Sequence, residues 1–228
     1  MKHERSYLQK VKRQLDNRLF SLEKVTFLLH QLSMMAFSSN HLSGKLRNMV
    51  TETRVYLSPI QDEHIDRYMA LSDDPELIAT MGWKPFGPNE KERFTQFLQV
   101  LTLPNLEGGR AMVFSIINAT DNKAIGYTSI QGISEKERRA EVGIAIMEKE
   151  YRGHGYGTEA LRHVVNYAFI ELGLTLLGLT VFPSNQRAIR AYEKVGFRKT
   201  EILEDSWLLP GGEYADMWVM EMSRDWLP

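Results

Sequence analysis

The segment with the most chemical potential is Arg152-Gly-His-Gly-Tyr-Gly-Thr158, in which three glycines alternate with other residues just before an amphipathic stretch. A glycine-rich turn between a strand and a helix leaves successive backbone N–H groups unpaired, and these groups bind a phosphate or pyrophosphate together with the helix dipole. Glycine is required because a side chain would keep the ligand away from the backbone. The pattern therefore predicts an anion site.

Two familiar nucleotide motifs do not fit this segment. A Walker A loop needs Lys before its Ser or Thr, whereas Gly157 precedes Thr158 here. A dinucleotide fingerprint needs G-x-G-x-x-G, whereas the spacing here is G-x-G-x-G. What remains is the pattern R-x-x-G-x-G, formed by Arg152, Gly155 and Gly157.

The residue types also limit the chemistry that is available. The chain has no Cys, which excludes disulfides, thiolate metal sites and a cysteine nucleophile and leaves histidine, carboxylate and hydroxyl chemistry. His154, Glu159 and His163 lack the spacing of zinc ligands, so no metal site is predicted. The sequence thus favours proton transfer by ordinary side chains.

The order of predicted elements indicates an α/β fold with a mixed sheet in one domain. Strands are expected at 54–57, 111–117, 123–130, 139–147, 176–182, 197–203 and 214–222. Helical signals cover 59–81, 90–101, the stretch from the glycine loop to Gly173, and 186–195. The glycine loop therefore connects a strand to a helix, as an anion site requires.

Charge is unevenly distributed along the chain. Residues 1–50 have nine Lys and Arg against three Asp and Glu, a net of +6, whereas residues 51–228 have nineteen against twenty-six, a net of −7. An acidic domain is poorly suited to nucleic acid and better suited to cationic or amine partners. The apolar stretch 25–37 is too short and too polar to span a membrane, and we expect a cytoplasmic protein.

Residues 1–48 are predicted to be a separate amphipathic helical extension with a linker, and residues 49–228 to be the main domain. Apolar residues recur at steps of three and four, at Leu8, Val11, Leu15, Leu22, Val25, Leu29 and Leu32. This helix could pack on the main domain or a partner, touch a membrane surface, or be an upstream extension with Met49 as the working start. Association into a homodimer is kept as a possibility.

Three parts of the sequence resemble the GNAT N-acetyltransferase superfamily. The first is the R-x-x-G-x-G loop, which resembles the acetyl-CoA pyrophosphate loop. The second is Asn185-x-x-Ala-x-x-x-Tyr192-Glu-Lys-x-Gly196-Phe197, and the third is the final strand 211–220, which resembles the branch that includes ribosomal-protein N-terminal acetyltransferases. The likeness covers about residues 51–225 and implies the GNAT fold, preceded by an extra helical segment.

The resemblance implies a role for each matching residue. Backbone groups of Ala145, Ile146 and Met147 would pair with the pantetheine arm of acetyl-CoA in a gap between strands. The amides from Arg152 through Thr158, which include Gly153, His154, Gly155, Tyr156 and Gly157, would hold the pyrophosphate. Asn185 would contact the cofactor, Tyr192 would act as the general acid toward the leaving thiolate, and Glu141 would be the general base.

Simpler interpretations remain open for the same side chains. Asn185 could be only a helix N-cap, Tyr192 a core aromatic, and Glu141 a strand residue in a salt bridge with Arg138 or Arg139. The loop at 83–88 could be mere packing or could line the acceptor pocket. The expected activity is direct acetyl transfer from acetyl-CoA to a primary amine, on a small molecule or a protein N-terminus; the alternative is a non-catalytic acyl-CoA-binding module.

Overall fold

The computed structural model describes residues 53–82, 90–100 and 110–226. Within these residues seven strands form one mixed sheet in the order β1-β2-β3-β4-β5-β7-β6. The strands are β1 (Val55–Pro59), β2 (Arg110–Asn118), β3 (Ala124–Ser134), β4 (Arg139–Ile146), β5 (Leu176–Val181), β6 (Arg198–Leu208) and β7 (Tyr214–Ser223). All neighbours pair antiparallel except β4 and β5, which are parallel. The predicted mixed α/β sheet is confirmed.

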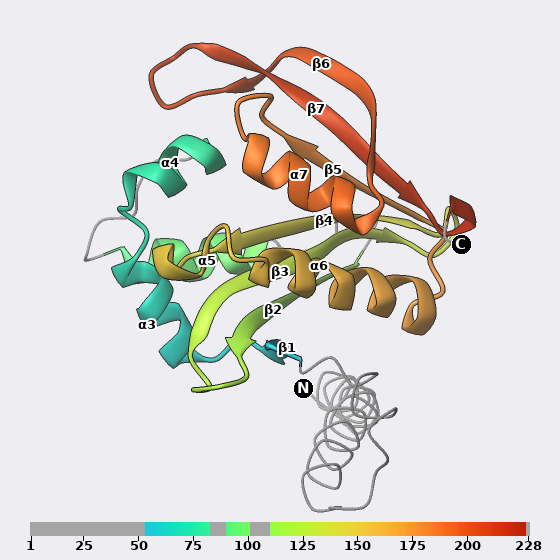
Figure 1. Cartoon of the computed structure of the whole chain (residues 1–228). Helices are drawn as coiled ribbons and strands as arrows, with labels where there is room; N and C mark the ends of the chain where they lie inside the picture. The colour runs from blue at the N-terminus through green and yellow to red at the C-terminus, as the bar shows by residue number, and fades with distance from the viewer. Residues whose placement is uncertain (1–52, 83–89, 101–109, 227–228) are drawn as a thin grey trace, which may run out of the picture. The chain divides into compact units, whose positions relative to one another are not determined.

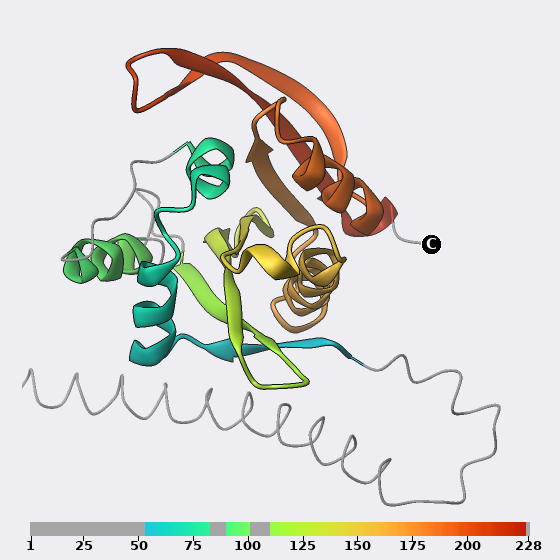
Figure 2. The same cartoon turned by 60° about the vertical axis from the view of Figure 1, so that its left-hand side comes forward.

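Helices cover the two faces of the sheet (Figures 1 and 2). One face carries α6 (Tyr156–Asn166) with its π-helical continuation Tyr167–Glu171, and α7 (Gln186–Val195). Their apolar residues pack with Val142, Leu177, Leu179 and Met220 in the largest core cluster. The other face carries α3 (Asp62–Ala70) and α5 (Lys91–Val100), and α4 (Pro75–Met81) lies near the end of β5.

Most predicted elements lie within one or two residues of the observed ones, but three differ in extent. The strand predicted at 123–130 continues to Ser134. The helical stretch 59–81 is two helices, because α3 ends at Ala70 and Asp74 caps a new helix that starts at Pro75. Proline is well tolerated in a first helical turn, where its missing N–H has no intrahelical partner. The strand predicted at 197–203 continues to Leu208, because register shifts against β7 keep the two strands paired beyond Leu203.

The pairing of β4 with β5 ends early. Only Arg139, Ala140 and Glu141 pair, with Leu176, Leu177 and Gly178. Both strands continue beyond this point, β4 to Ile146 and β5 to Val181. Among the described residues, the last five residues of β4 therefore have no ladder on the β5 side.

The end of β4 also contains a bulge. The amides of Met147 and Glu148 both donate to the carbonyl of Ile125, which places two residues opposite one. A Cβ on Gly126 would lie 2.1 Å from the carbonyl oxygen of Ala145, so this close approach of β3 and β4 requires glycine. The bulge re-aims the chain just before the glycine loop.

The outer strand β6 is exposed along nearly its whole length. Its pairing with β7 shifts register between Lys199 and Glu201 and again between Leu203 and Trp207. Asp205, inside the second shift, has φ 47°. In the described part of the chain, no helix is long and apolar enough to cross a membrane.

Two predictions concern residues that the structure does not describe. The amphipathic helix expected before residue 49 lies in 1–52, and the aromatic loop expected at 83–88 lies in 83–89. Both remain predictions, as does the domain boundary at 48.

Candidate active site

The glycine loop is built as an anion site. Gly153 and Gly155 have φ of 79° and 87°, and Gly155 is the N-cap of α6. These left-handed conformations turn the backbone so that consecutive amides face outward, at little steric cost because glycine lacks a Cβ. Within the described residues, the amides from Gly153 to Thr158 have no hydrogen-bond acceptor. They are free to bind a phosphate at the positive end of the helix.

Arg152, unlike the residues that follow it in the loop, does not have a free amide. Its amide donates to the carbonyl of Lys149 at 3.1 Å. Its side chain is only 3% exposed, and Nη1 lies 3.1 Å from Asp74 Oδ1 and 3.3 Å from Glu76 Oε2. Arg152 is therefore committed to the protein on both its backbone and its side chain.

The Arg152 guanidinium also holds the end of β4. Nε donates to the carbonyl of Ile146 at 2.9 Å, and Nη2 donates to the carbonyl of Met147. One buried cation thus joins β4 to α4. It stabilises the segment that leads into the loop rather than facing the place where a phosphate would bind.

The unpaired edge of β4 offers backbone groups to an extended ligand. Because the Met147 amide points to Ile125 on β3, the alternation of an antiparallel ladder turns the groups of Ala145 toward β3 and those of Ile144 and Ile146 toward β5. The edge therefore presents Ile144 and the amide of Ile146. The backbone groups of Met147 are engaged within the protein.

Tyr192 lies on α7 inside the largest core cluster, with its ring 6.0 Å from that of Phe197. Burial raises the pKa of Tyr192 to about 12. No hydrogen-bond partner for its hydroxyl is found among the described residues. The phenol is thus protonated at neutral pH, which is the form a general acid needs.

Asn185 is the N-cap of α7. Its Oδ1 accepts a hydrogen bond from the amide of Ala188 at 3.1 Å, which satisfies one of the free amides of the first turn. The structural interpretation of Asn185 is therefore correct. Its side-chain NH₂ group has no acceptor in the part of the chain that the structure describes, so the cap is compatible with a contact to a cofactor.

Glu141 lies on the opposite face of the sheet from Tyr192. Ala140 and Val142 belong to the core beneath α6 and α7, so the alternation of a strand turns Glu141 to the other side. Its partner on β5 is Gly178, and a Cβ built on Gly178 would have no other described atom within 4 Å. The space beside Glu141 is therefore open. No ion pair of Glu141 with Arg138 or Arg139 is found in the described part of the chain, where Arg138 instead binds the carbonyl of Gly173.

Glu141 and Tyr192 are therefore not neighbours on one surface. The pairing between β4 and β5 ends at Glu141, and the core below those strands contains Tyr192. A thioester lying along the free edge of β4 would have the tyrosine on one side and the glutamate on the other. This arrangement separates a proton donor from a proton acceptor.

Sequence reasoning missed three charged residues at the site. Asp74 and Glu76 bind Arg152 from α4, and Arg54 contacts the glycine loop from the start of β1. Asp-Pro before an apolar run signals a helix start, which could have singled out Asp74 as a cap. The ion pair of Asp74 with Arg152 joins distant parts of the chain, and no local signal in the sequence indicates it.

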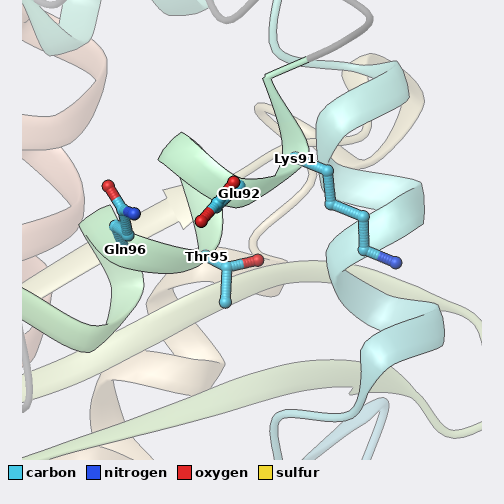
Figure 3. A pocket seen from close by; sticks show the side chains of 4 residues that line it. All are labelled: Lys91, Glu92, Thr95 and Gln96. Atoms are coloured by element: carbon cyan, nitrogen blue, oxygen red, sulfur yellow. The ribbon is translucent and has the colours of Figure 1, made fainter.

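A hollow on α5 does not coincide with any of these residues. Lys91, Glu92, Thr95 and Gln96 line it, all from one helix (Figure 3). Lys91 forms an ion pair with Asp66 of α3. No residue of the predicted site is among the described residues that line this hollow.

The chain is similar to known acetyltransferases. The profile of the Acetyltransferase (GNAT) domain matches residues 54–198. The uncharacterised N-acetyltransferase YoaA of Bacillus subtilis is 27% identical over 163 residues, which are 71% of this chain and 89% of YoaA. The putative ribosomal N-acetyltransferase YdaF of Bacillus subtilis is 27% identical over 106 residues, 46% of this chain and 57% of YdaF.

A solved structure shares the fold. Spermidine N-acetyltransferase from Vibrio cholerae, in complex with CoA and spermine, has a TM-score of 0.63 at 19% identity, covering 76% of this chain and 98% of that one. The chain belongs to the GNAT acetyltransferase family. It is an acetyl-CoA-dependent N-acetyltransferase.

Proposed function

We propose that this protein transfers the acetyl group of acetyl-CoA to a primary amine by direct attack within a ternary complex. The observation that supports the proposal is that two groups of unpaired backbone N–H and C=O groups follow each other directly along the chain. The free edge of β4 leads through a bulge into the free amides of Gly153 to Thr158. The pantetheine arm fits the first group as an added strand, and the pyrophosphate fits the second.

The proton transfers can be assigned to two side chains. An amine reaches the site mostly protonated, and Glu141 accepts its proton through water. The amine nitrogen then attacks the acetyl carbonyl carbon, and a backbone N–H on the β4 edge stabilises the oxyanion. As the intermediate collapses, the C–S bond breaks and the second proton of the nitrogen passes to water. Tyr192 donates its proton to the departing thiolate and is reprotonated from solvent. The chain has no Cys, so no acyl-cysteine step is involved.

Two kinds of acceptor are supported to a similar extent. The Vibrio cholerae neighbour is a spermidine enzyme, and YdaF is named a putative ribosomal N-acetyltransferase. The net charge of −7 over residues 51–228 favours a cationic acceptor of either kind. We further propose that the enzyme acts in the cytoplasm, which suits a chain without cysteine.

A panel of amines tests the proposal. Polyamines, amino acids, amino sugars and short peptides with free N-termini are each incubated with acetyl-CoA, thiol release is followed, and products are identified by mass spectrometry. We expect acetylation of at least one cationic amine. CoA binding without turnover on any amine would favour the non-catalytic binding module.

The cofactor site has its own prediction. Gly155→Val should abolish CoA binding, because φ of 87° is strained for a β-branched residue and the side chain would cover the loop amides. In wild type, CoA at 100 times its Kd should stabilise the fold by about 2.7 kcal/mol in thermal unfolding. The control is Gly211→Val, a turn position with open space around it. Equal CoA binding by wild type and a folded Gly155→Val would exclude the loop.

A further inference from the structure

Arg54 is a charged residue outside the glycine loop whose side chain contacts the loop. Its Nε lies 3.0 Å from Glu159 Oε2, and its Nη1 donates to the carbonyl of His154 at 3.1 Å. Its guanidinium lies over the ring of Tyr156, 4.8 Å from the centroid. Contacts with His154, Tyr156 and Glu159 therefore fix the position of the Arg54 guanidinium.

The free end of the guanidinium points toward the loop. A Cβ built on Gly155 would lie 3.1 Å from Arg54 Nη2. The side chain is 47% exposed, and among the described residues Nη2 has no hydrogen-bond acceptor. Its N–H donors are therefore available to a ligand at Gly155.

The charge of Arg54 also corrects an unfavourable feature of the loop. Glu159 lies in the first turn of α6, where its carboxylate would repel an anion bound at the helix N-terminus. Its two oxygens accept from the Arg54 and Val55 amides and from Arg54 Nε, so the pair is held in place. With Arg54 present, the entrance to the loop has no net negative charge from this pair.

We propose that Arg54 is a binding residue for a phosphate group of the CoA nucleotide. It places an N–H donor and a positive charge beside the Gly155 amide, so that the phosphate is held by backbone on one side and by guanidinium on the other. The proposal depends on acetyl-CoA binding at the glycine loop, as stated under the proposed function.

Isothermal titration calorimetry with Arg54→Gln tests the proposal. The full-length variant is titrated with CoA, with dephospho-CoA, which lacks the 3′-phosphate, and with pantetheine, which lacks all the nucleotide phosphates. CoA affinity should fall roughly ten- to hundredfold, the effect of losing a hydrogen bond to a charged group. Pantetheine affinity should be unchanged. The control is Arg162→Gln, which changes an exposed arginine of α6.

The ligand series separates the sources of the effect. An equal loss for CoA and dephospho-CoA assigns Arg54 to the pyrophosphate, and a loss confined to CoA assigns it to the 3′-phosphate. A similar loss for pantetheine would overturn the proposal, because it would mean that Arg54 only supports the fold. Unchanged CoA binding by folded Arg54→Gln would overturn it as well.

A second variant keeps the test decisive if Arg54→Gln does not fold. Arg54→Lys retains the charge and loses the fork of donors, so CoA affinity should fall by a smaller factor and become more sensitive to salt than in wild type. CoA affinity and salt dependence equal to wild type would contradict the proposal. Failure of wild type itself to bind CoA would instead overturn the proposed function.

Discussion

At the scale of single residues, the environment of Tyr192 gives the proposed mechanism its proton donor. Desolvation raises the pKa of this phenol to about 12, so it keeps its proton throughout the neutral range. A thiolate leaving group needs a proton at the moment the C–S bond breaks. A buried tyrosine whose hydroxyl has no acceptor among the described residues is suited to supply it.

Tyr192→Phe should lower turnover roughly 10²- to 10⁴-fold, the usual contribution of a positioned general acid. The ring and its contact with Phe197 are retained, so CoA affinity and the free energy of unfolding should change little. Turnover is measured by thiol release, and stability by urea unfolding. Tyr214→Phe, at an exposed position, is the control. Undiminished turnover in Tyr192→Phe would remove the tyrosine from the mechanism.

Glu141→Gln should reduce activity most at low pH, where the amine is hardest to deprotonate and a carboxylate acceptor matters most. The activity of the variant relative to wild type should therefore rise as pH increases. The measurement is kcat/KM from about pH 6 to pH 9, with the exposed Glu137→Gln as control. A ratio independent of pH would indicate that another group accepts the proton.

The types of these residues were predictable from sequence, but their surroundings were not. Local spacing located Asn185 as a helix cap and the glycines as a turn. The inward position of Arg152 was not predictable, because its carboxylate partners lie on α4, far away in the chain. A salt bridge for Glu141 was a reasonable local expectation, yet Arg138 turns to the Gly173 carbonyl instead.

At the scale of elements, α4 is held by charged contacts as well as by the packing of Leu77 in the core. Asp74 caps the helix through the amides of Glu76 and Leu77 and also binds Arg152. Glu76 binds both Arg152 and Arg187 of α7. The carbonyl of Gly82, the C-cap of α4, accepts a bond from Trp207 Nε1 at 3.1 Å. This short helix thus connects the glycine loop, α7 and the β6–β7 hairpin.

Asp74→Asn should destabilise the protein by roughly 1.5–3 kcal/mol at pH 7, because Asn can still cap α4 while the charged hydrogen bond to Arg152 is lost. Burial raises the pKa of Asp74, but the Leu77 amide and Arg152 outweigh it and hold the pKa below its ordinary value of 3.8. The contribution of a lowered carboxylate pKa is complete above 3.8 and is lost as pH falls through the folded pKa.

The difference in unfolding free energy between wild type and Asp74→Asn should therefore shrink in acid. It is measured by urea unfolding at pH 7 and at steps down to about pH 3, with the exposed neighbour Asp73→Asn as control. A difference that stays constant across this range would show that the Asp74 charge is not what holds α4.

Element positions were largely predictable because their signals are local. Helix 186–195 was expected between an Asn cap and Gly196, and the structure has α7 at these bounds. The break between α3 and α4 lies just before Pro75. The prediction of one helical stretch over 59–81 did not use this proline as a boundary. The early end of the β4–β5 ladder arises from the pairing of distant strands, and no local pattern encodes it.

At the scale of the whole molecule, the sequence motifs of the proposed site all lie after Met49. The family match begins at residue 54. Arg54 lies at this limit and contacts the loop about a hundred residues later. The segment 1–48 is thus predicted to be dispensable for the chemistry, whereas Arg54 is not.

A protein shortened to start at Met49 should bind CoA with the Kd of the full chain in calorimetry, and should acetylate the same amine at a similar rate. Its oligomeric state, measured by light scattering, is allowed to change. Weaker CoA binding by a folded protein of this length would show that the segment before Met49 completes the site.

The fold class was predictable because alternating strand and helix signals allow few arrangements of one sheet. Which residues lie on which face of the sheet was not predictable, since this depends on the register between strands that are far apart in the sequence. Glu141 and Tyr192 fall on opposite sides because Ala140 and Leu177 share the core face. A sequence pattern gives the faces of each strand but not which helices cover them.

The outer strand β6 has a consequence for the behaviour of concentrated protein. A long, flat, exposed edge is a template on which other chains add strands and form fibrils. Two register shifts, the left-handed Asp205 and the charges of Arg198, Lys199 and Glu204 interrupt this edge. The irregular pairing of β6 therefore makes this edge a poorer template for the addition of strands from other chains than a flat edge of the same length would be.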